Sequence, residues 1–252
     1  SIYSDLRFAA SLKRTYPNSF IVLVGTHPTA TVNETMDAER AVDAIARGEY
    51  DVTILELAKA LSANRQINTV LGLSYRSNGH IIHNDNREPL EELDQIPMAA
   101  KFIKEHLDVY DYVFPAATYP AIQIFTGRGC PARCNYCVYP QVMHGHKYRQ
   151  RTTQNVVEEF LYIAENFPDV KEIVIEDDTF TIEKKRVLEI CEMLIANNMH
   201  KRFKWLCNAR VNLDYETMKM MKKAGCRLLI PGVESFNQEI LKNIKKGTTT
   251  KQ

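Results

Sequence analysis

Three cysteines cluster near the middle of the chain, and this cluster constrains the protein more than any other feature. Cys130, Cys134 and Cys137 follow one another in a C-x3-C-x2-C spacing. Three thiolates this close in sequence can grip one metal centre, but a closed structural zinc site needs four ligands. A cubane iron–sulfur cluster held by only three cysteines keeps one iron free for a ligand that is not protein. The spacing therefore indicates a metal centre with an open position, at which a bound molecule is activated.

Two other interpretations of the cluster remain open on spacing alone. His144 and His146 follow seven and nine residues after Cys137, so the three cysteines together with His144 are also candidates for a structural zinc site. The third interpretation is a set of unligated thiols that pack as small hydrophobic groups. The other cysteines of the chain lie inside apolar stretches, and we interpret them as core residues: Cys191, Cys207 and Cys226.

Composition limits the partners that the chain can have. The 252 residues carry a formal net charge of +1, which gives no electrostatic argument for binding nucleic acid or a membrane surface. No apolar run approaches the roughly 18 residues of a membrane-spanning helix, and the first residues lack the basic and apolar blocks of a secretory signal. Six cysteines, three of them clustered, indicate metal chemistry in a reducing cytoplasm rather than a disulfide framework. We therefore expect a cytoplasmic protein that acts on a small molecule.

The first part of the chain alternates between helical and strand patterns. The continuous apolar run at residues 20–24 predicts a strand buried on both faces of a parallel sheet, and residues 25–28 are predicted to form the turn after it. Apolar side chains at helical spacing predict three helices, over residues 3–15, 33–46 and 51–63. This alternation is part of a doubly wound α/β domain, which we assign to residues 1–68.

A segment of different character, residues 69–120, follows that domain. Asn78 and Gly79 lie between two short apolar runs, and an Asn-Gly pair in this position predicts a β-hairpin with a two-residue turn. Prolines and charged residues are frequent over residues 85–120. We interpret this part as an interdomain linker with one short helix near residues 99–107.

From residue 121 onward the chain repeats a strand followed by a helix. Continuous apolar runs predict four strands, at residues 121–125, 173–175, 203–207 and 227–230. Apolar side chains at helical spacing predict helices at residues 153–167, 183–197, 214–223 and 236–245. Repeated strand–helix units predict a parallel sheet with right-handed crossovers, so we assign residues 121–252 to a second α/β domain.

Polar side chains follow every predicted strand of this second domain. In parallel α/β barrels the active site is built from the loops at the carboxyl ends of the strands. A single polar residue in such a position can also serve as a helix cap, so the argument rests on the whole set. After the cysteines, which follow the first strand, the set contains Asp177 and Asp178, then Arg210, then Glu234 and Ser235.

The cysteine motif resembles the signature of the radical S-adenosylmethionine (radical SAM) superfamily, because Tyr136 puts an aromatic residue before the last cysteine and the motif lies between a strand and a helix. The resemblance implies a [4Fe–4S] cluster bound by the three cysteines, whose fourth iron chelates the amino and carboxylate groups of SAM. It further implies that the cluster donates an electron that cleaves SAM, giving a 5′-deoxyadenosyl radical that abstracts hydrogen. An electron donor such as flavodoxin or ferredoxin is then an expected partner.

The resemblance extends to the other strand ends and implies where SAM binds. Residues 232–235 resemble the motif after the family's fourth strand, which faces the ribose and methionine of SAM. Residues 208–210 resemble a third-strand motif whose arginine pairs with the SAM carboxylate. Residues 175–180 stand where a second-strand motif contacts the SAM amino group, although they depart from its common Gly-Gly-Glu form. The implied SAM-binding residues are Tyr136, against adenine, with Asp177, Asp178, Arg210, Glu234 and Ser235.

The first domain resembles the cobalamin (B12)-binding domain that precedes many radical SAM proteins. The D-x-H-x-x-G loop that ligates cobalt in many such domains is absent and would lie upstream of residue 1. We therefore interpret His27 as a loop histidine rather than a cobalt ligand. Gly25 either lets the backbone approach a flat cofactor or closes a turn. The resemblance is carried by residues 24–28, 42–49 and 72–76, and by a linker motif at residues 93–97.

The sequence as a whole predicts an α/β protein in which a partial doubly wound domain (Rossmann-like, of the B12-binding type) precedes a partial (βα) radical SAM barrel. The family's barrel usually has six βα units and about four are visible, so we expect an unpaired strand edge at residues 227–230 and no full activity from this chain alone. Residues that bind the substrate are expected in later segments. The resemblance implies methyl transfer, or an oxidative or ring-forming modification of an unactivated carbon. The competing hypothesis is a zinc-stabilised binding module.

Overall fold

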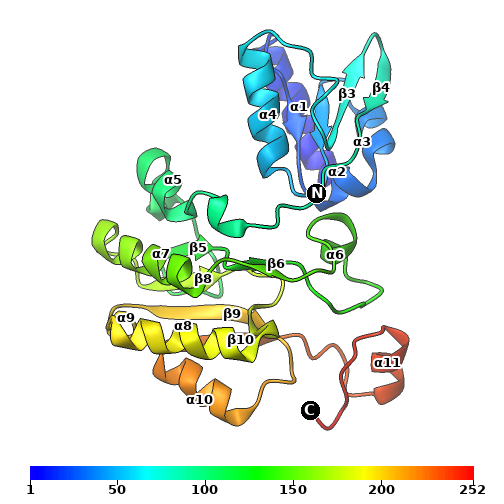
Figure 1. Cartoon of the computed structure of the whole chain (residues 1–252). Coiled ribbons are helices and arrows are strands. Elements are labelled where there is room, and N and C mark those ends of the chain that lie inside the picture. Colours follow the sequence, from blue (N-terminus) through cyan, green and yellow to red (C-terminus); the bar gives the residue numbers. More distant parts are fainter. The chain divides into compact units, whose positions relative to one another are not determined.

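The computed structural model describes residues 1–252, and the chain folds into two units (Figure 1). One unit contains residues 1–90 and the short segment 137–145, and the other contains residues 91–136 and 146–252. The chain therefore passes between the units three times, after residues 90, 136 and 145. None of its helices combines the length and the apolar character that crossing a bilayer requires.

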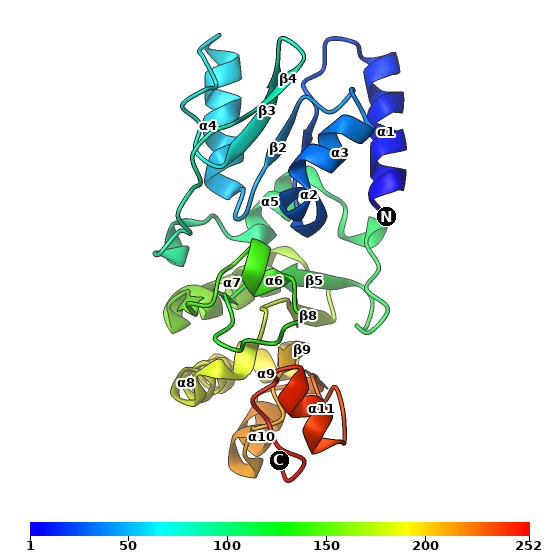
Figure 2. The ribbon, with the colours of Figure 1, turned by 90° about the vertical axis from the view of Figure 1, so that its right-hand side faces the viewer.

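The first unit is a four-stranded sheet with helices on both faces (Figure 2). Its elements are α1 (Ile2–Thr15), β1 (Val22–Leu23), α2 (Thr26–Ala30), α3 (Val32–Ala38), β2 (Ala44–Ala46), α4 (Asp51–Ser62), β3 (Leu73–Ser77), β4 (His80–His83) and α6 (Tyr139–Val142). The strands lie in the order β1-β2-β3-β4, with β1 parallel to β2 and the later pairs antiparallel. Helices α1 and α3 pack on the face that carries Ile45, and α4 packs on the face that carries Ala44 and Leu73. Neighbouring residues of β2 thus enter different cores, as alternation along a strand requires.

The hairpin predicted from the Asn-Gly pair is confirmed. Strands β3 and β4 pair antiparallel, with Ser77 opposite His80. Asn78 has φ 48° and Gly79 has φ 83°, and positive φ at both positions is what a type I′ turn demands. Because β3 also pairs with β2, the sheet of the first unit continues beyond residue 68, where the first domain is predicted to end.

One predicted helix of the first unit is wrong in its second half. The spacing of apolar residues predicts a helix over residues 33–46, but α3 ends at Ala38 and residues 44–46 form strand β2. All three residues of β2 are completely buried between helices on both sides, and this packing overrides the helical preference of alanine. The turn predicted at residues 25–28 is also different, because the short helix α2 begins at Thr26 and contains His27. Gly25, at φ 108°, redirects the chain into that helix.

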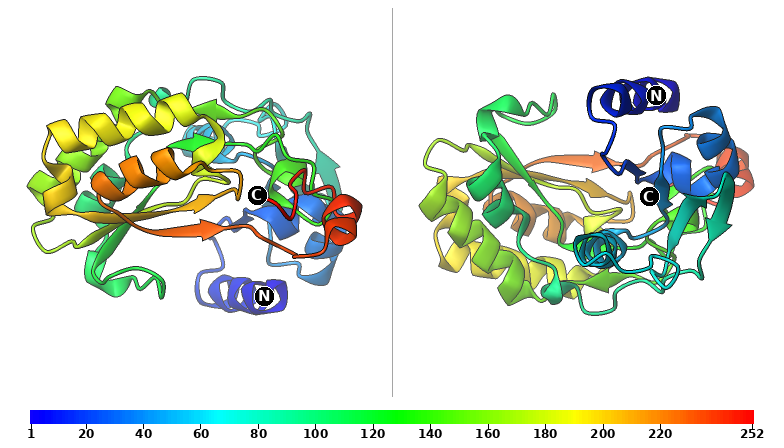
Figure 3. Two further views of the ribbon diagram at one scale, coloured as in Figure 1. Left: turned by 90° about the horizontal axis from the view of Figure 1, so that it is seen from below. Right: turned by 90° about the horizontal axis from the view of Figure 1, so that it is seen from above.

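The second unit is built on four parallel strands whose spatial order follows the chain, β5-β8-β9-β10. Its elements are η1 (Leu93–Gln95), α5 (Ala99–His106), η2 (Val109–Asp111), β5 (Ala121–Ile124), β6 (Gly127–Arg128), β7 (Arg149–Gln150), α7 (Thr153–Asn166), β8 (Glu172–Ile175), η3 (Phe180–Ile182), α8 (Lys184–Ala196), α9 (Met199–Arg202), β9 (Lys204–Ala209), α10 (Tyr215–Lys223), β10 (Cys226–Pro231) and α11 (Gln238–Asn243). The predicted parallel sheet and its crossover helices are confirmed, and β10 lies at an edge of the sheet as expected. Helices α7, α8 and α10 cover one face (Figure 3).

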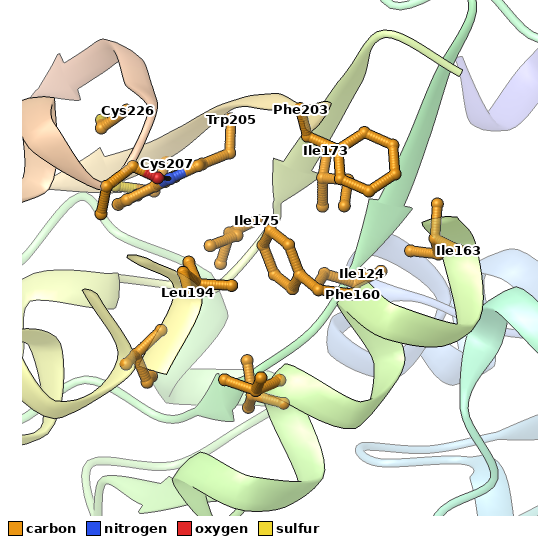
Figure 4. Close-up of a cluster of buried hydrophobic side chains, with 14 of the residues drawn as sticks. Ile124, Phe160, Ile163, Ile173, Ile175, Leu194, Phe203, Trp205, Cys207 and Cys226 are labelled. Carbon is orange, nitrogen blue, oxygen red and sulfur yellow. Dashed lines mark hydrogen bonds between the residues drawn. The ribbon is translucent and has the colours of Figure 1, made fainter. Parts of the chain in front are cut away.

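An apolar core fills the space between this sheet and its helices (Figure 4). The parallel register aligns side chains of β5, β8 and β9 into two rows that face the helices: Ile122, Ile173 and Trp205, then Ile124, Ile175 and Cys207. Phe160 of α7 and Leu194 of α8 are completely buried against these rows. Trp205 also donates its indole N–H to the carbonyl oxygen of Ala224 at 2.9 Å. This core fixes the strands, and so fixes the positions at which their carboxyl ends deliver polar side chains.

Candidate cofactor site at the strand ends

The cysteines follow the carboxyl end of β5. After Ile124 the chain forms the short strand β6, which pairs with β7, and Gly129 then turns it with φ 86°, in a region that favours glycine. The side chain of Cys130 is buried, whereas Cys134 and Cys137 are half-buried, and none of the three forms a disulfide. Cys137 is the first residue of the segment that groups with the first unit.

Two aspartates at the end of β8 hold the backbone that leads into the cysteines. The carboxylate of Asp177 is almost fully buried and accepts hydrogen bonds from the N–H of Thr126 at 2.6 Å and from its hydroxyl at 2.5 Å. It also accepts from the N–H of Gly127. Asp178 accepts from the N–H of Gly129 at 2.8 Å. Burial raises the pKa of Asp177, while the hydrogen bonds from Thr126 act in the opposite direction. In this structure Asp177 therefore holds backbone, and its predicted role toward SAM stays a prediction.

The first cysteine is held from a second side. His146 donates a ring N–H to the carbonyl oxygen of Cys130 at 3.1 Å, and the hydroxyl of Thr179 lies 3.9 Å from the Cys130 sulfur. His144 belongs to the segment that groups with the first unit. The structure gathers no three His, Cys, Asp or Glu side chains into a metal-ligating arrangement, so the choice between a cluster and a zinc site rests on family membership.

A buried ion pair lies beneath the strand end of β5. Arg151 donates to the carboxylate of Glu159 at 2.5 Å and to the carbonyl oxygen of Phe125 at 2.6 Å. Arg186 donates to the carbonyl oxygen of Thr126 at 2.8 Å. Removing one partner of such a pair leaves the charge of the other buried and uncompensated. Sequence reasoning missed this network, although Glu159 gave a signal, since it interrupts the apolar face of α7 next to Phe160.

At the end of β10 the structure brings Tyr136 and Glu234 together. The hydroxyl of Tyr136 is hydrogen-bonded to the carboxylate of Glu234, and Lys246 donates to the same carboxylate at 2.8 Å. The Lys246 ammonium lowers the pKa of Glu234, because it stabilises the charged form of the carboxylate. Burial and the Glu234 hydrogen bond raise the pKa of Tyr136. Lys246 is a site residue that sequence reasoning missed.

Arg210 and Ser235 have separate surroundings. Arg210, at the end of β9, donates its guanidinium to the carbonyl oxygen of Lys246 at 2.7 Å and its backbone N–H to the hydroxyl of Thr181 at 3.1 Å. The hydroxyl of Ser235 accepts from the N–H of Asn237 at 3.1 Å, next to the start of α11. A guanidinium has five donors, so Arg210 keeps donors for a further partner.

The cysteine segment also contacts the chain after α11. Asn135 donates its backbone N–H to the carbonyl oxygen of Ile244 and its side-chain N–H to that of Asn243, both at 3.1 Å. The residues 243–246 thus contact the cysteine segment through Asn135, the end of β9 through Arg210 and the end of β10 through Glu234. Four successive strand ends and one C-terminal segment form a connected polar rim in the second unit.

Comparison with known proteins identifies the family to which the chain belongs. Residues 124–252 match the family model described as the Radical SAM superfamily. This match spans half of the chain, and the chain belongs to that superfamily. The predicted recognition is therefore confirmed, and the zinc-stabilised module that competed with it has no support.

Curated relatives extend the likeness to the rest of the chain. An uncharacterized methyltransferase of Pyrococcus horikoshii is 32% identical over 100% of this chain and 53% of its own length. An anaerobic magnesium-protoporphyrin IX monomethyl ester cyclase of Synechocystis is 27% identical over 97% of this chain and 48% of its own length. The chain spans about half the length of the curated relatives it matches.

Two solved structures share the fold. The cobalamin-dependent S-adenosylmethionine radical enzyme OxsB, with aqua-cobalamin and S-adenosylmethionine bound, aligns with a TM-score of 0.76 at 22% identity, over 99% of this chain and 36% of that one. The radical S-adenosylmethionine methyltransferase TsrM of Kitasatospora setae aligns with a TM-score of 0.73 at 19% identity, over 98% of this chain and 48% of that one. At these identities the likeness concerns the fold, and it agrees with the predicted α/β class and parallel sheet.

Proposed function

We propose that this chain is the cofactor-binding part of a cobalamin-associated radical SAM enzyme, which performs methyl transfer or an oxidative or ring-forming modification of an unactivated carbon. The observation that carries the proposal is the C-x3-C-x2-C motif at the carboxyl end of β5, in a chain that belongs to the radical SAM superfamily. Relatives described as methyltransferases and as a cyclase support the reaction class.

The donor set of the motif fits a [4Fe–4S] cluster. Cys130, Cys134 and Cys137 form no disulfide, and thiolate sulfur is the ligand that such clusters take from proteins. When bound, the cluster supplies the electron that cleaves SAM reductively, and the 5′-deoxyadenosyl radical so formed abstracts hydrogen. Asp178 and His146 hold the backbone on either side of Cys130, and this keeps the first ligand in place before any metal arrives.

The polar rim supplies groups suited to the charged ends of SAM. Glu234 is held in its ionised form by Lys246, so it can accept hydrogen bonds from an amino group or from ribose hydroxyls. Arg210 is the candidate partner of the SAM carboxylate, since a guanidinium can bind a carboxylate through two parallel hydrogen bonds. Asp178 and Ser235 are further candidates, and Tyr136 is the candidate partner of adenine. The role that we propose for Asp177 is to fix the backbone that leads into the cysteines.

Cobalamin is the second cofactor of the proposal, and the first unit is its proposed site. The support is the likeness of that unit to the neighbours described as cobalamin-bound. The backbone offers one matching feature at Gly25, where a side chain would meet nothing within 4 Å and φ is 108°, so a flat ring could approach the main chain there. His27 is exposed on α2 and is not proposed as a cobalt ligand. The proposed functional boundaries remain 1–68, 69–120 and 121–252.

The six cysteines form no disulfide, which supports a reducing compartment such as the cytoplasm, where flavodoxin or ferredoxin could supply electrons. The substrate is proposed to be a small molecule, bound with the help of segments that longer relatives possess.

The first test is SAM cleavage by the reconstituted protein. After anaerobic reconstitution with iron and sulfide, the chain is mixed with SAM and a strong reductant, and 5′-deoxyadenosine is measured. We expect its formation with the wild-type chain and none with Cys134→Ala. A cluster-loaded chain that binds SAM but forms no 5′-deoxyadenosine would contradict the proposed chemistry.

The second test concerns the SAM-binding residues. Charge-assisted hydrogen bonds are worth roughly 1.5–3 kcal/mol, so Arg210→Ala should weaken SAM binding about ten- to a hundredfold. Iron content should not change, because Arg210 is no cluster ligand. Calorimetric titration of SAM into cluster-loaded protein measures the effect, with the surface variant Arg14→Ala as the matched control. Unchanged affinity in Arg210→Ala would remove this arginine from the SAM site.

A further inference from the structure

Lys246 is a buried lysine in a segment that looks like an exposed, charged tail. Only 7% of the residue is exposed, and lysines are almost never buried unless they are paired. Its neighbours Lys245 and Gly247 both have left-handed φ, 54° and 69°. The backbone bends around Lys246, and the side chain turns inward, where its ammonium donates to Glu234 Oε1 at 2.8 Å. The left-handed φ of Lys245 ends α11, and the turn that follows brings the Lys246 ammonium to the Glu234 carboxylate.

The backbone of Lys246 is fixed as well. Its N–H donates to the carbonyl oxygen of Leu241 at 3.0 Å, and its own carbonyl oxygen accepts from Arg210 at 2.7 Å. The residue is therefore tied to α11 and to the end of β9 before its side chain reaches the end of β10. Such a residue can hold a carboxylate at one position with little freedom.

Glu234 is the residue that needs holding. It has φ 63°, a left-handed conformation that is uncommon for residues other than glycine, asparagine or aspartate. Backbone strain of this kind persists only where the surroundings over-determine it, and it clusters at ligand sites. The hydrogen bonds from Lys246 and Tyr136 are the contacts that fix its carboxylate.

Gly232 makes room for this ion pair. A Cβ atom at Gly232 would lie 2.7 Å from Lys246 Nζ and 2.9 Å from Glu234 Oε1, both closer than side chains tolerate. The need for glycine here is steric, because the crowding comes from the two charged groups. Gly232, Glu234 and Lys246 therefore depend on one another: the two charged side chains form an ion pair, and the glycine leaves the space for it.

We propose that Lys246 is a positioning residue that holds the Glu234 carboxylate ready to receive SAM, with Gly232 leaving the space in which the two groups meet. The inference rests on the proposed function, because Glu234 is a proposed SAM ligand. Lys246 acts through Glu234 and has no contact of its own with SAM. Its loss leaves Glu234 free to turn away and also leaves its charge without a partner.

The test is a double-variant cycle on SAM affinity in the reconstituted chain. Lys246→Met should weaken SAM binding about tenfold, because one charged hydrogen bond no longer holds Glu234. Glu234→Gln should weaken binding at least as much. If Lys246 acts through Glu234, the double variant should bind SAM no more weakly than Glu234→Gln alone, because coupled residues are not additive. Iron per chain should stay at the wild-type value throughout. The matched control is Lys242→Met, an exposed lysine of α11, which should bind SAM normally.

The outcomes separate this inference from the proposal on which it rests. Effects that multiply in the double variant would overturn the positioning role, and so would normal SAM affinity in Lys246→Met with a loss of thermal stability only. A cluster-loaded wild-type chain that binds no SAM would overturn the proposed function and the inference with it. If Lys246→Met does not fold, Gly232→Ala decides, because its Cβ displaces the Lys246 ammonium and the Glu234 carboxylate from their present positions while both charges remain. Normal SAM affinity in a folded Gly232→Ala chain would then overturn the inference.

Discussion

The chain carries two sets of cysteines whose surroundings differ, one in the motif after β5 and one in the apolar core of the second unit. One set follows β5, in the segment that begins after Gly129, and consists of Cys130, Cys134 and Cys137. Cys130 is buried, and the other two are half-buried. The other set is completely or almost completely buried in the apolar core and lies on three elements, α8, β9 and β10: Cys191, Cys207 and Cys226. Figure 4 labels two of them, Cys207 and Cys226.

Burial changes the acidity of two thiols of the core set. It raises the pKa of Cys191 to about 12 and also raises the pKa of Cys207 well above its usual value. Since the thiolate is the form that binds metals, these two core thiols remain protonated and inert near neutral pH. The lesson is that a cysteine's neighbours in the fold decide whether it acts as a small hydrophobic residue or as a ligand.

The largest effect that separates the two sets is on iron. Each of Cys130→Ala, Cys134→Ala and Cys137→Ala should abolish the bound cluster, because three thiolates are its only protein ligands. Cys207→Ala, the matched control from the core, should keep wild-type iron in the folded chain. Iron per chain after anaerobic reconstitution measures both. Full iron occupancy in all three motif variants would show that the motif cysteines bind iron no differently from the core cysteines.

The next effect concerns the core that carries the inert set. Trp205→Ala should destabilise the chain by about 3–5 kcal/mol, because it removes a buried aromatic side chain and leaves a cavity. It also removes the hydrogen bond to Ala224 and the edge-on contact with Phe180, whose ring centroid is 5.7 Å away. Denaturant unfolding of the metal-free chain measures the change. The control is Tyr215→Ala, whose ring is 70% exposed; equal losses in the two variants would contradict the assigned core.

A smaller effect is expected where the core meets the cysteine segment. Asp177→Asn should cost about 1–3 kcal/mol, because an amide nitrogen faces an N–H donor that the carboxylate had satisfied. Thr126 and Gly127 supply the donors in question. We expect slower or partial iron uptake as well, since these residues precede the cysteines. Unfolding curves compared with those of the exposed variant Asp111→Asn provide the check, and identical stabilities would show that Asp177 does not hold this backbone.

The smallest effect is expected for a single core thiol. Cys191→Ala should lower stability by about 1 kcal/mol, the common cost of a modest core substitution. Iron content and SAM cleavage should remain at wild-type values. Thermal unfolding and iron assays on the same preparation sharpen the comparison, because a loss of iron at wild-type stability would make Cys191 a functional thiol.

The sequence predicts the second unit better than the first, for a physical reason. Long apolar runs such as residues 173–175 have one stable place in an α/β protein, a strand covered by helices. Residues 44–46, Ala-Ile-Ala, suit a helix as well as a strand, and only their burial between two helical layers decides for β2. The local pattern therefore predicts a strand correctly where the run is strongly apolar. It fails where tertiary packing decides between helix and strand.

The residues of the candidate site also differ in how far the sequence predicts them. The cysteine motif is local, so its spacing alone indicates a metal centre. Lys246 and Glu159 were missed because isolated charges normally lie in solvent, and the local pattern does not identify Glu234 and Arg151 as their partners. The contact of Tyr136 with Glu234 joins residues far apart in the chain, so it depends on the fold and not on a pattern.

Metal analysis of the anaerobically reconstituted wild-type chain tests the central claim most directly. The account predicts a brown protein with about four irons and about four sulfides per chain. It also predicts that these values persist when Cys191, Cys207 and Cys226 are all replaced by alanine in a chain that still folds. A colourless protein that retains one zinc per chain and takes up no iron would contradict the account.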